Sequence, residues 1–258
     1  MSNKFVLLTF ADHLEDVKNG IKYLLQRLLG FKRYLIVFSR FKIATLHKDK
    51  KESDFFTFLT LLTNPNLILD IGANLGIMTV HLSKRFPNAT IHAIEPIPDN
   101  LEVLYANITH YKLSNVIVHE IAVGDEEKSV KMVLPHQGKT KMQGLSHVKH
   151  ESISDWNDGD EFEVDCLKLD TLFPSDKVDA IKLDVENFEF FTIRGGIEII
   201  KRSKPVIYAE LWDNANRVKC FELLMQLGYT INVVENGVLV PFDELNHNQQ
   251  NFIFLVGE

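Results

Sequence analysis

The amino-acid sequence predicts an α/β protein built on a doubly wound, mostly parallel sheet that ends in an antiparallel pair of C-terminal strands. Three observations support this class. From residue 67 onward, short apolar runs rich in β-forming residues alternate with segments of helical periodicity. The run "LILDIG" passes through glycines directly into a helical segment. Near the end of the chain, β-like segments carry an Asn236-Gly237 turn signal.

The elements follow one another in alternating order. Wholly apolar runs, as expected for strands buried on both faces of a parallel sheet, predict strands at 66–72, 90–96, 115–123, 178–185 and 205–211. Apolar residues at helical spacing predict helices at 76–86, 98–111, 188–202 and 215–228. Additional strands at 130–134 and 162–169 flank a long loop from about 135 to 159, and the C-terminal strands lie in 229–240 and 251–256.

Length and composition indicate a soluble, cytoplasmic protein. A chain of 258 residues with 45% hydrophobic content can bury a sizeable core. Cys166 and Cys220 show no paired spacing, which favours a reducing compartment. No apolar stretch approaches the roughly 20 residues of a membrane span, and we expect no export signal. We expect residues 1–55 to form a basic, aromatic extension on the core and residues 56–258 to form the main domain.

Charge is distributed unevenly along the chain. Residues 1–52 hold 11 Lys and Arg against five Asp and Glu, whereas residues 53–258 hold 17 against 30. The acidic main part argues against a nucleic-acid substrate, since phosphate neutralisation supplies most nonspecific affinity. The basic N-terminal part is interpreted as a helix and a strand that cover the core with solvated charges. The alternative is a docking face for an anionic substrate, a lipid surface or a partner chain, including a second copy of this protein.

The strand-to-helix turn after residue 71 predicts a cofactor site. In open α/β sheets, ligands bind beyond the carboxyl ends of the strands. Gly72 and Gly76 allow a sharp turn and a close approach to a ligand, but they lack the middle glycine of a dinucleotide fingerprint. Asp70, at the end of the strand, suits a positively charged cofactor such as S-adenosylmethionine. Glu95 ends the next strand, where a carboxylate accepts hydrogen bonds from ribose hydroxyls.

Several ordered motifs carry a family resemblance. The segments "DIGANLG", "AIEPIPDNLEVLYANI", "IAVGDEE", "LKLDTLF", "IKLDVENFEFFTIRGG" and "KPVIYAEL" resemble, from about Asn66 to Leu211, the blocks of the FkbM-type methyltransferases, a class I, Rossmann-like family. The resemblance implies S-adenosylmethionine as the methyl donor and, as the reaction, O-methylation of a hydroxyl on a sugar, a glycan or a small metabolite. It also implies these donor-binding residues: Asp70, Gly72, Asn74 and Gly76 in the donor loop, Glu95 on the ribose, and Ala122 with Asp125 near the adenine. Asn187 stands where the family usually has glycine.

Acidic residues gather where two later strands end. Methyl transfer to a hydroxyl requires alignment of the acceptor oxygen, and it benefits from a group that takes the acceptor's proton. Asp184, Glu186 and Glu189 follow the predicted strand at 178–185, and Glu210 ends the next strand. We interpret Asp184, Glu186 and Glu189 as catalytic candidates. For Glu186 and Glu189 an alternative stays open, namely that they stabilise the first turn of a helix through its dipole.

The long loop supplies the remaining candidates. Loops of this length in a compact domain are often lids or binding segments. His136, His147, His150 and Trp156, together with Glu210, are predicted to contact the acceptor. The alternative is a polar loop without a binding role. The histidine spacing matches no known zinc site, so no metal is expected.

Two other functions stay open at this point. The first is a catalytically degenerate methyltransferase fold that binds a partner through its basic extension, and Asn187 is the feature that favours it. The second is a dinucleotide-dependent oxidoreductase, which the missing glycine opposes.

Overall fold

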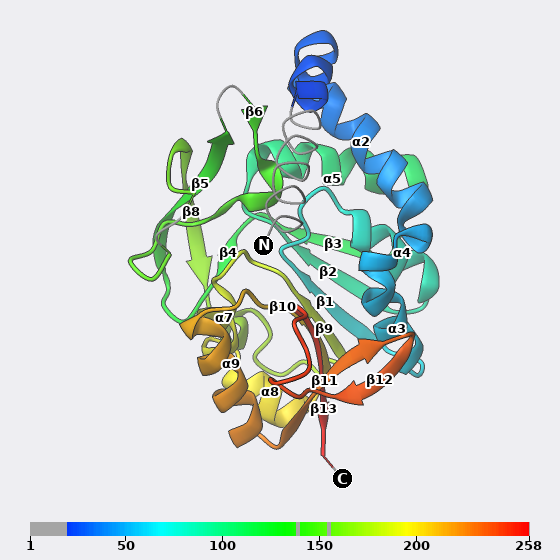
Figure 1. Cartoon of the computed structure of the whole chain (residues 1–258), viewed down its shortest axis with the longest axis vertical. Helices are drawn as coiled ribbons and strands as arrows, with labels where there is room; N and C mark the ends of the chain where they lie inside the picture. The colour runs from blue at the N-terminus through cyan, green and yellow to red at the C-terminus, as the bar shows by residue number, and fades with distance from the viewer. Residues whose placement is uncertain (1–19, 138–139, 154–155, 258) are drawn as a thin grey trace, which may run out of the picture.

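The computed structural model describes residues 20–137, 140–153 and 156–257, and it contains two sheets (Figure 1). The larger sheet has eight strands in the order β12-β11-β13-β10-β9-β1-β2-β3. Their bounds are β1 (Leu67–Ile71), β2 (Thr90–Ile94), β3 (Val116–His119), β9 (Ala180–Leu183), β10 (Val206–Glu210), β11 (Tyr229–Glu235), β12 (Val238–Pro241) and β13 (Asn251–Val256). β3, β2, β1, β9 and β10 run parallel, which confirms the predicted fold class. The antiparallel part has three strands, since β13 inserts between β10 and β11.

Helices cover both faces of the larger sheet. Their bounds are α2 (Phe31–Thr45), α3 (Ser53–Leu61), α4 (Ile77–Arg85), α5 (Pro98–Tyr111), α6 (Leu169–Leu172), α7 (Glu189–Arg194), α8 (Ile197–Ser203) and α9 (Ala215–Gln226). On one face, Ile68 belongs to a buried cluster with Phe58 of α3. On the other face, its neighbour Leu69 belongs to a cluster with Leu224 of α9. Because successive strand residues point to opposite faces, each face carries its own apolar core.

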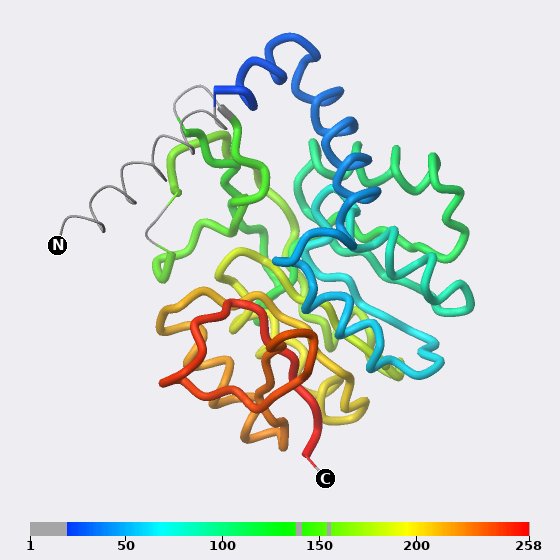
Figure 2. Tube along the Cα trace, turned by 45° about the vertical axis from the view of Figure 1, so that its right-hand side comes forward, coloured from blue at the N-terminus to red at the C-terminus, as the bar shows by residue number. Residues whose placement is uncertain are grey.

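The smaller sheet is built from the long insertion between β3 and β9. Its strands are β4 (Ala122–Val123), β5 (Lys128–Gln137), β6 (Thr140–Lys141), β7 (His147–Val148) and β8 (Gly159–Leu167). β5 and β8 pair antiparallel, and the short 3-10 helix η3 (Gln143–Leu145) lies between β6 and β7. Figures 1 and 2 show this sheet, in green, to the left of α2, in blue, and the two meet where the ammonium nitrogen of Lys141, on β6, lies 5.1 Å from the ring centre of Phe31. The predicted loop thus contains secondary structure of its own.

The N-terminal part differs from its prediction. Within the described residues from 20 to 66, the chain forms helices, and the predicted strand there is wrong. Tyr34, Leu35, Ser39 and Ile43 recur at helical spacing and are buried, so α2 packs on α4 and α5. The predicted domain boundary at residue 55 lies inside α3. Among the described helices, none has the length and apolar character that a membrane span requires.

Candidate functional site

The loop between β1 and α4 brings backbone groups to the carboxyl edge of the sheet. The backbone N–H groups of Gly72 and Ala73 both donate to the carbonyl oxygen of Ile94, on β2, at 3.0 Å. Gly72 has a φ of 75°, and a Cβ at this position would lie 1.7 Å from the carbonyl oxygen of Asp184. Gly76, with a φ of 77°, starts α4. Glycine at position 72 is therefore required both by its backbone angle and by the contact between the loops after β1 and β9.

Glu95 organises the same loop from the end of β2. Its Oε2 accepts the backbone N–H of Asn74 at 2.7 Å, and its Oε1 accepts the backbone N–H of Ile97 at 2.9 Å and the side-chain amide of Asn100 at 3.2 Å. Burial raises the pKa of Glu95, and these three hydrogen bonds act in the opposite direction. A carboxylate has about four lone-pair sites, so Glu95 has capacity for a further donor.

Asp70 lies beneath the loop and is fully buried. Its Oδ2 accepts the hydroxyl of Thr79 at 2.5 Å, and its Oδ1 lies 3.4 Å from the ammonium nitrogen of Lys182, on β9. Lys182 also donates to the carbonyl oxygen of Gly72 at 2.8 Å and lies 3.7 Å from Asp184. Burial acts to lower the pKa of Lys182, but Asp70 and Asp184 outweigh it and raise that pKa. Asp70 thus supports the loop from within through Lys182.

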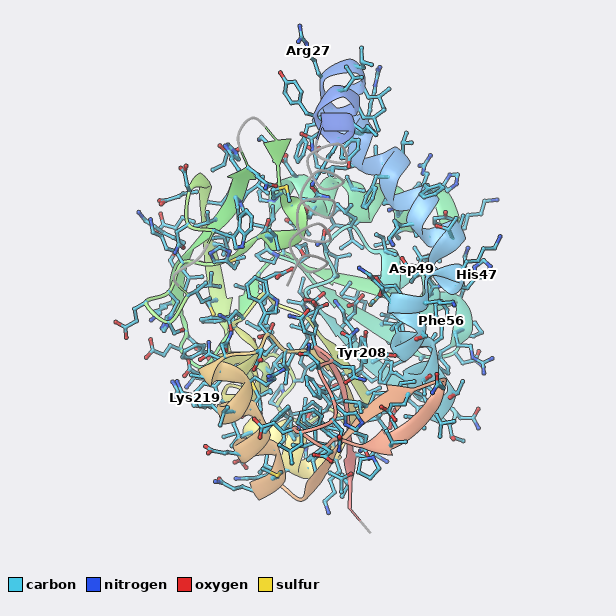
Figure 3. All side chains as sticks on the ribbon, viewed as in Figure 1. Arg27, His47, Asp49, Phe56, Tyr208 and Lys219 are labelled. Carbon is cyan, nitrogen blue, oxygen red and sulfur yellow. The ribbon has the colours of Figure 1, made fainter. Side chains whose placement is uncertain are left out.

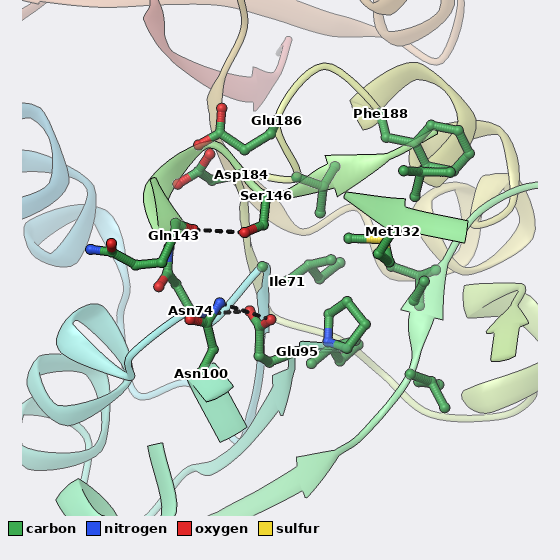
Figure 4. Close-up of a pocket in the computed structure, with 18 residues that line it drawn as sticks. Ile71, Asn74, Glu95, Asn100, Met132, Gln143, Ser146, Asp184, Glu186 and Phe188 are labelled. Carbon is green, nitrogen blue, oxygen red and sulfur yellow. Dashed lines mark hydrogen bonds between the residues drawn. The ribbon is translucent and has the colours of Figure 1, made fainter. Parts of the chain in front are cut away.

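A pocket opens beside this loop, between the larger sheet and the insertion (Figure 4). From the loops after β1, β2 and β9 it is lined by Gly72, Asn74, Glu95, Asp184 and Glu186, from the first turn of α5 by Asn100, and from the insertion by Ala122, Val123, Met132, Gln143, Ser146 and Val148. Figure 4 shows Asp184 and Glu186 side by side on one wall and Glu95 with Asn74 and Asn100 on another. We call this the donor pocket.

The donor pocket has a polar character that suits a cationic, hydrogen-bonding ligand. Three of its lining residues are carboxylates, and no Lys or Arg of the described chain lines it. The side-chain oxygens of Asn74, Asn100 and Gln143 are buried, and none of them accepts a hydrogen bond from the described part of the chain. Buried polar atoms are normally paired. These atoms are therefore acceptors for hydrogen-bond donors on a bound molecule.

The structure separates the two predicted adenine-side residues. Ala122 lines the donor pocket, but Asp125 does not, and its carboxylate forms an ion pair with Arg194 at the end of α7. Sequence reasoning missed the lining residues Met132, Gln143 and Val148, which the insertion supplies. For Gln143 and Val148 the signal was the unusual length of the loop that holds them, and Met132 lies in the strand predicted at 130–134.

Asp184 and Glu186 form a carboxyl pair on the pocket wall. Glu186 has a φ of 51°, which is uncommon for a residue other than glycine. Burial, followed by Asp184 and Glu210, raises the pKa of Glu186 well above its usual range. Glu210, at the end of β10, has its pKa raised to about 7, first by Asp184 and then by burial.

Glu189 has a different environment. It is 2% exposed and does not line the donor pocket. Its Oε1 accepts the backbone N–H groups of Val185 and Asn187 at 3.0 and 3.1 Å. Glu189 therefore holds the turn between β9 and α7, and it lies in the first turn of α7. Burial raises its pKa to about 8.

Asn187 stands in this turn at the position where the resemblance predicts glycine. The residue adopts a φ of 74°, a left-handed conformation that Asn tolerates. Its Oδ1 accepts hydrogen bonds from the side-chain amides of Asn214, at 2.8 Å, and Asn216, at 3.3 Å. The substitution thus adds a connection between the turn and the start of α9.

The four loop candidates lie away from the donor pocket. His136 faces Asp160 on β8 at 3.3 Å, and His147 is buried between the Leu145 carbonyl and Asn157. His150 contacts the rings of Phe188 and Phe191, and Trp156 is 38% exposed. Gln143 and Ser146 of the same loop line the donor pocket instead, and Gly144 lines a second pocket beside it, on the side of α2. Among the described residues, no group of His, Cys, Asp and Glu side chains is arranged to hold a metal ion.

The doubly wound sheet, together with a carboxylate-lined pocket beyond the ends of β1 and β2, defines a class I methyltransferase. Residues 70–236 match the family described as the methyltransferase FkbM domain, which is more than half of the chain. The protein belongs to the FkbM methyltransferase family. This result favours the methyltransferase interpretation over a dinucleotide-dependent oxidoreductase.

Individual relatives are distant. The chain is 25% identical over 144 residues to "Methyltransferase 1" of Beauveria bassiana, a match that covers 50% of this chain and 58% of that protein. It is 22% identical over 219 residues to "Methyltransferase sdnD" of Sordaria araneosa, covering 75% of this chain and 84% of that one. The crystal structure of a methyltransferase FkbM from Methylobacillus flagellatus has a TM-score of 0.53 and 14% identity, and covers 94% of this chain and 60% of that chain.

The cofactor of this family is S-adenosylmethionine. Its sulfonium and amino groups are cationic, which fits a pocket lined by carboxylates and free of Lys and Arg side chains in the described chain. Its amino and hydroxyl groups are hydrogen-bond donors, which fit the buried oxygens of Asn74 and Asn100 and the remaining capacity of Glu95. The charged and polar groups that line the donor pocket therefore match those of S-adenosylmethionine.

Proposed function

We propose that this methyltransferase acts on a hydroxyl oxygen of a sugar, a glycan or a small metabolite. The observation that carries the proposal is the Asp184–Glu186 carboxyl pair on the wall of the donor pocket. A hydroxyl oxygen becomes a better nucleophile when its proton leaves as the new bond forms, and a positioned base contributes about 10²–10⁴-fold to such a step. A carboxylate whose pKa is raised is a stronger base, and the environment of Glu186 has this effect.

The residues of the chain would act as follows. Glu95, with Asn74 and Asn100, holds the ribose and the donor loop, while the turn held by Glu189 presents Asp184 and Glu186. S-adenosylmethionine supplies an electrophilic methyl carbon, and the sulfur keeps the electron pair of the broken bond. The carboxyl pair takes the hydroxyl proton from the acceptor. Lys182 balances the charge of Asp184 and holds the Gly72 carbonyl in the loop that would bind the donor.

Donor affinity provides the first test of this proposal. S-adenosylhomocysteine is titrated by calorimetry into the wild type, Glu95→Gln and the control Glu102→Gln, whose side chain is about half exposed on α5. We expect Glu95→Gln to weaken binding about 10–100-fold, since a hydrogen bond to a charged group contributes about 1.5–3 kcal/mol. Glu102→Gln should bind like the wild type. A wild-type protein that does not bind contradicts the proposal.

Methyl transfer provides the second test. Labelled S-adenosylmethionine is incubated with a panel of monosaccharides, polyols and phenols, and Glu186→Gln is compared with the wild type. We expect transfer that falls about 10²–10⁴-fold in the variant while donor affinity is retained. Donor binding without transfer to any hydroxyl compound would favour the degenerate fold that serves as a binding protein.

A further inference from the structure

A second pocket adjoins the donor pocket on the side of α2. It shares Gly72, Asn74, Gln143 and Asp184 with the donor pocket, so the two pockets have a common wall. Its opposite wall comes from the N-terminal part of the chain. That wall includes Phe38 of α2, Lys42 of α2, Leu46 and Glu52. A molecule seated in this second pocket would lie next to the donor and beside Asp184.

The second pocket contains both cationic groups and hydrogen-bond acceptors in its described lining. Both of its cations are already paired: Lys42 contacts Asp49 at 2.8 Å, and Lys182 contacts Asp70 and the Gly72 carbonyl. Asp49 is labelled in Figure 3, on the blue segment that follows α2. Gln143 is 6% exposed, and its side-chain oxygen accepts no hydrogen bond within the described chain. The second pocket therefore offers acceptor oxygens to a ligand that donates hydrogen bonds.

Glu52 is the acidic residue that the N-terminal part contributes to this pocket. It lies in η2 (Lys50–Glu52), directly before α3. Burial raises the pKa of Glu52, Lys42 and Lys182 lower it, and Asp49 and Asp184 raise it. Glu52 is thus close enough to Asp184 for their charges to interact across the pocket. An anion placed between Glu52 and Asp184 would meet like charge with no free cation of the described lining to compensate it.

The remaining lining of the second pocket is mainly apolar. Phe38, Leu46 and Met78 line it, with Leu75 and Ile77. Leu46 is 1% exposed, and Phe38 and Met78 are half-buried. The second pocket therefore combines apolar side chains with acceptor oxygens, which suits a ligand that has both a carbon-rich surface and O–H or N–H groups.

We propose that the second pocket is the methyl-acceptor site, and that Glu52 determines specificity by selecting uncharged, hydrogen-bond-donating acceptors and rejecting anionic ones. This inference rests on the proposed function. The N-terminal segment from α2 to η2 is accordingly part of the active site. The acceptor lies with its apolar face on Phe38 and Met78, and its donors face Glu52 and Gln143.

Analogues of S-adenosylhomocysteine test the inference without a known acceptor. In these probes a nitrogen replaces the sulfur and carries a dihydroxyalkyl, a carboxyalkyl or a plain alkyl arm of equal length. In the wild type, calorimetry should show the dihydroxyalkyl arm binding about tenfold tighter than the plain arm, as one or two net hydrogen bonds allow. The carboxyalkyl arm should bind more weakly than the plain arm.

Two variants identify which residues cause the differences in affinity among the three arms. In Glu52→Gln, the affinity for the analogue with the carboxyalkyl arm should come within about twofold of the affinity for the analogue with the plain arm. In Phe38→Ala, the affinities for all three analogues should fall by about the same factor. Neither variant should change the affinity for S-adenosylhomocysteine itself by more than about twofold, and Glu102→Gln should change nothing. Equal binding of the three arms, or an unchanged carboxyalkyl penalty in Glu52→Gln, overturns the inference while the proposed function stands. A wild-type protein that binds neither S-adenosylhomocysteine nor its analogues overturns both.

Discussion

Asp70 is a buried carboxylate whose charged partner, Lys182, is equally buried, and this pairing determines what its substitution does. Asp70→Asn leaves the Lys182 ammonium without its main compensating charge. We expect the free energy of unfolding, measured by urea titration, to fall by about 3–5 kcal/mol, the typical cost of breaking a buried pair. Thr79→Val, which removes only the hydroxyl donor to Asp70, should cost about 1–3 kcal/mol.

The opposite result for Asp70 would also be informative. A variant with wild-type stability but greatly weakened S-adenosylmethionine binding would show that Asp70 acts on the donor directly, as the sequence suggests.

Glu189 should make the stability of the protein depend on pH. Its pKa in the folded protein is about 8, against 4.5 for an ordinary glutamate. The folded protein therefore keeps a proton that the unfolded chain releases, and the free energy of unfolding falls as pH rises from about 4.5 to about 8. Below this window the contribution is fully present, and above it the contribution is lost.

The variant that tests this pH dependence is Glu189→Gln. It removes the titratable carboxyl but keeps a carbonyl oxygen for the backbone N–H groups of Val185 and Asn187. We expect denaturant titrations to show a decline across this window that is shallower than in the wild type by up to about 1.4 kcal/mol per pH unit. Glu189→Ala should be less stable than Glu189→Gln at every pH, since it loses the acceptor. Parallel pH profiles for Glu189→Gln and the wild type would contradict this account.

Sequence patterns identify some residues of the site and not others. Gly72 and Glu95 can be predicted because a fixed position after a parallel strand decides their place. Gln143, Ser146 and Val148 cannot, since they reach the donor pocket only through the fold of an insertion whose strands pair over long sequence distances. The loop histidines have suitable chemistry, but packing and local hydrogen bonds direct them elsewhere.

At the scale of elements, the contact between the ends of β1 and β9 depends on one glycine. Gly72→Ala would force a Cβ into the Asp184 carbonyl, whereas Gly228, with a φ of 88°, has open space where a Cβ would lie. We expect Gly228→Ala to cost about 1 kcal/mol, for backbone strain alone. Gly72→Ala should cost several times more, about 3 kcal/mol or above, and should weaken donor binding. Thermal unfolding and calorimetry measure both effects.

Helices and strands are predicted best where burial alone determines the spacing of their apolar residues. The parallel strands have apolar sequences because both of their faces are covered by helices. The segment at 188–202 is predicted as one helix, but it divides into α7 and α8. Gly195 and Gly196 lie between the two helices, and glycine is required at position 195 because a Cβ there would lie 1.9 Å from the Gly124 carbonyl oxygen. Such a contact joins segments far apart in sequence and has no local signal.

At the scale of the whole molecule, ligand binding should connect the insertion to the larger sheet. The donor pocket takes its lining from the loop after β1 and from residues 143–148 of the insertion. We expect saturating S-adenosylhomocysteine to slow amide hydrogen exchange in both segments, by up to about 100-fold at 100 times Kd. The β11–β12 hairpin, which lies at the far edge of the sheet, should exchange at its original rate. Protection confined to the loop after β1 would show that the insertion does not close on the donor.

The ammonium group of Lys182 touches Asp70, Asp184 and the backbone of Gly72, three points that come from two different strands and the loops at their ends. We therefore expect that an amino-acid substitution at position 70, 72, 182 or 184 will affect which residues are tolerated at the other three. A lineage that loses the lysine must also neutralise both acids, and a lineage that replaces the glycine must reshape the strand end it rests on. We expect these four positions to be inherited together or exchanged as a set.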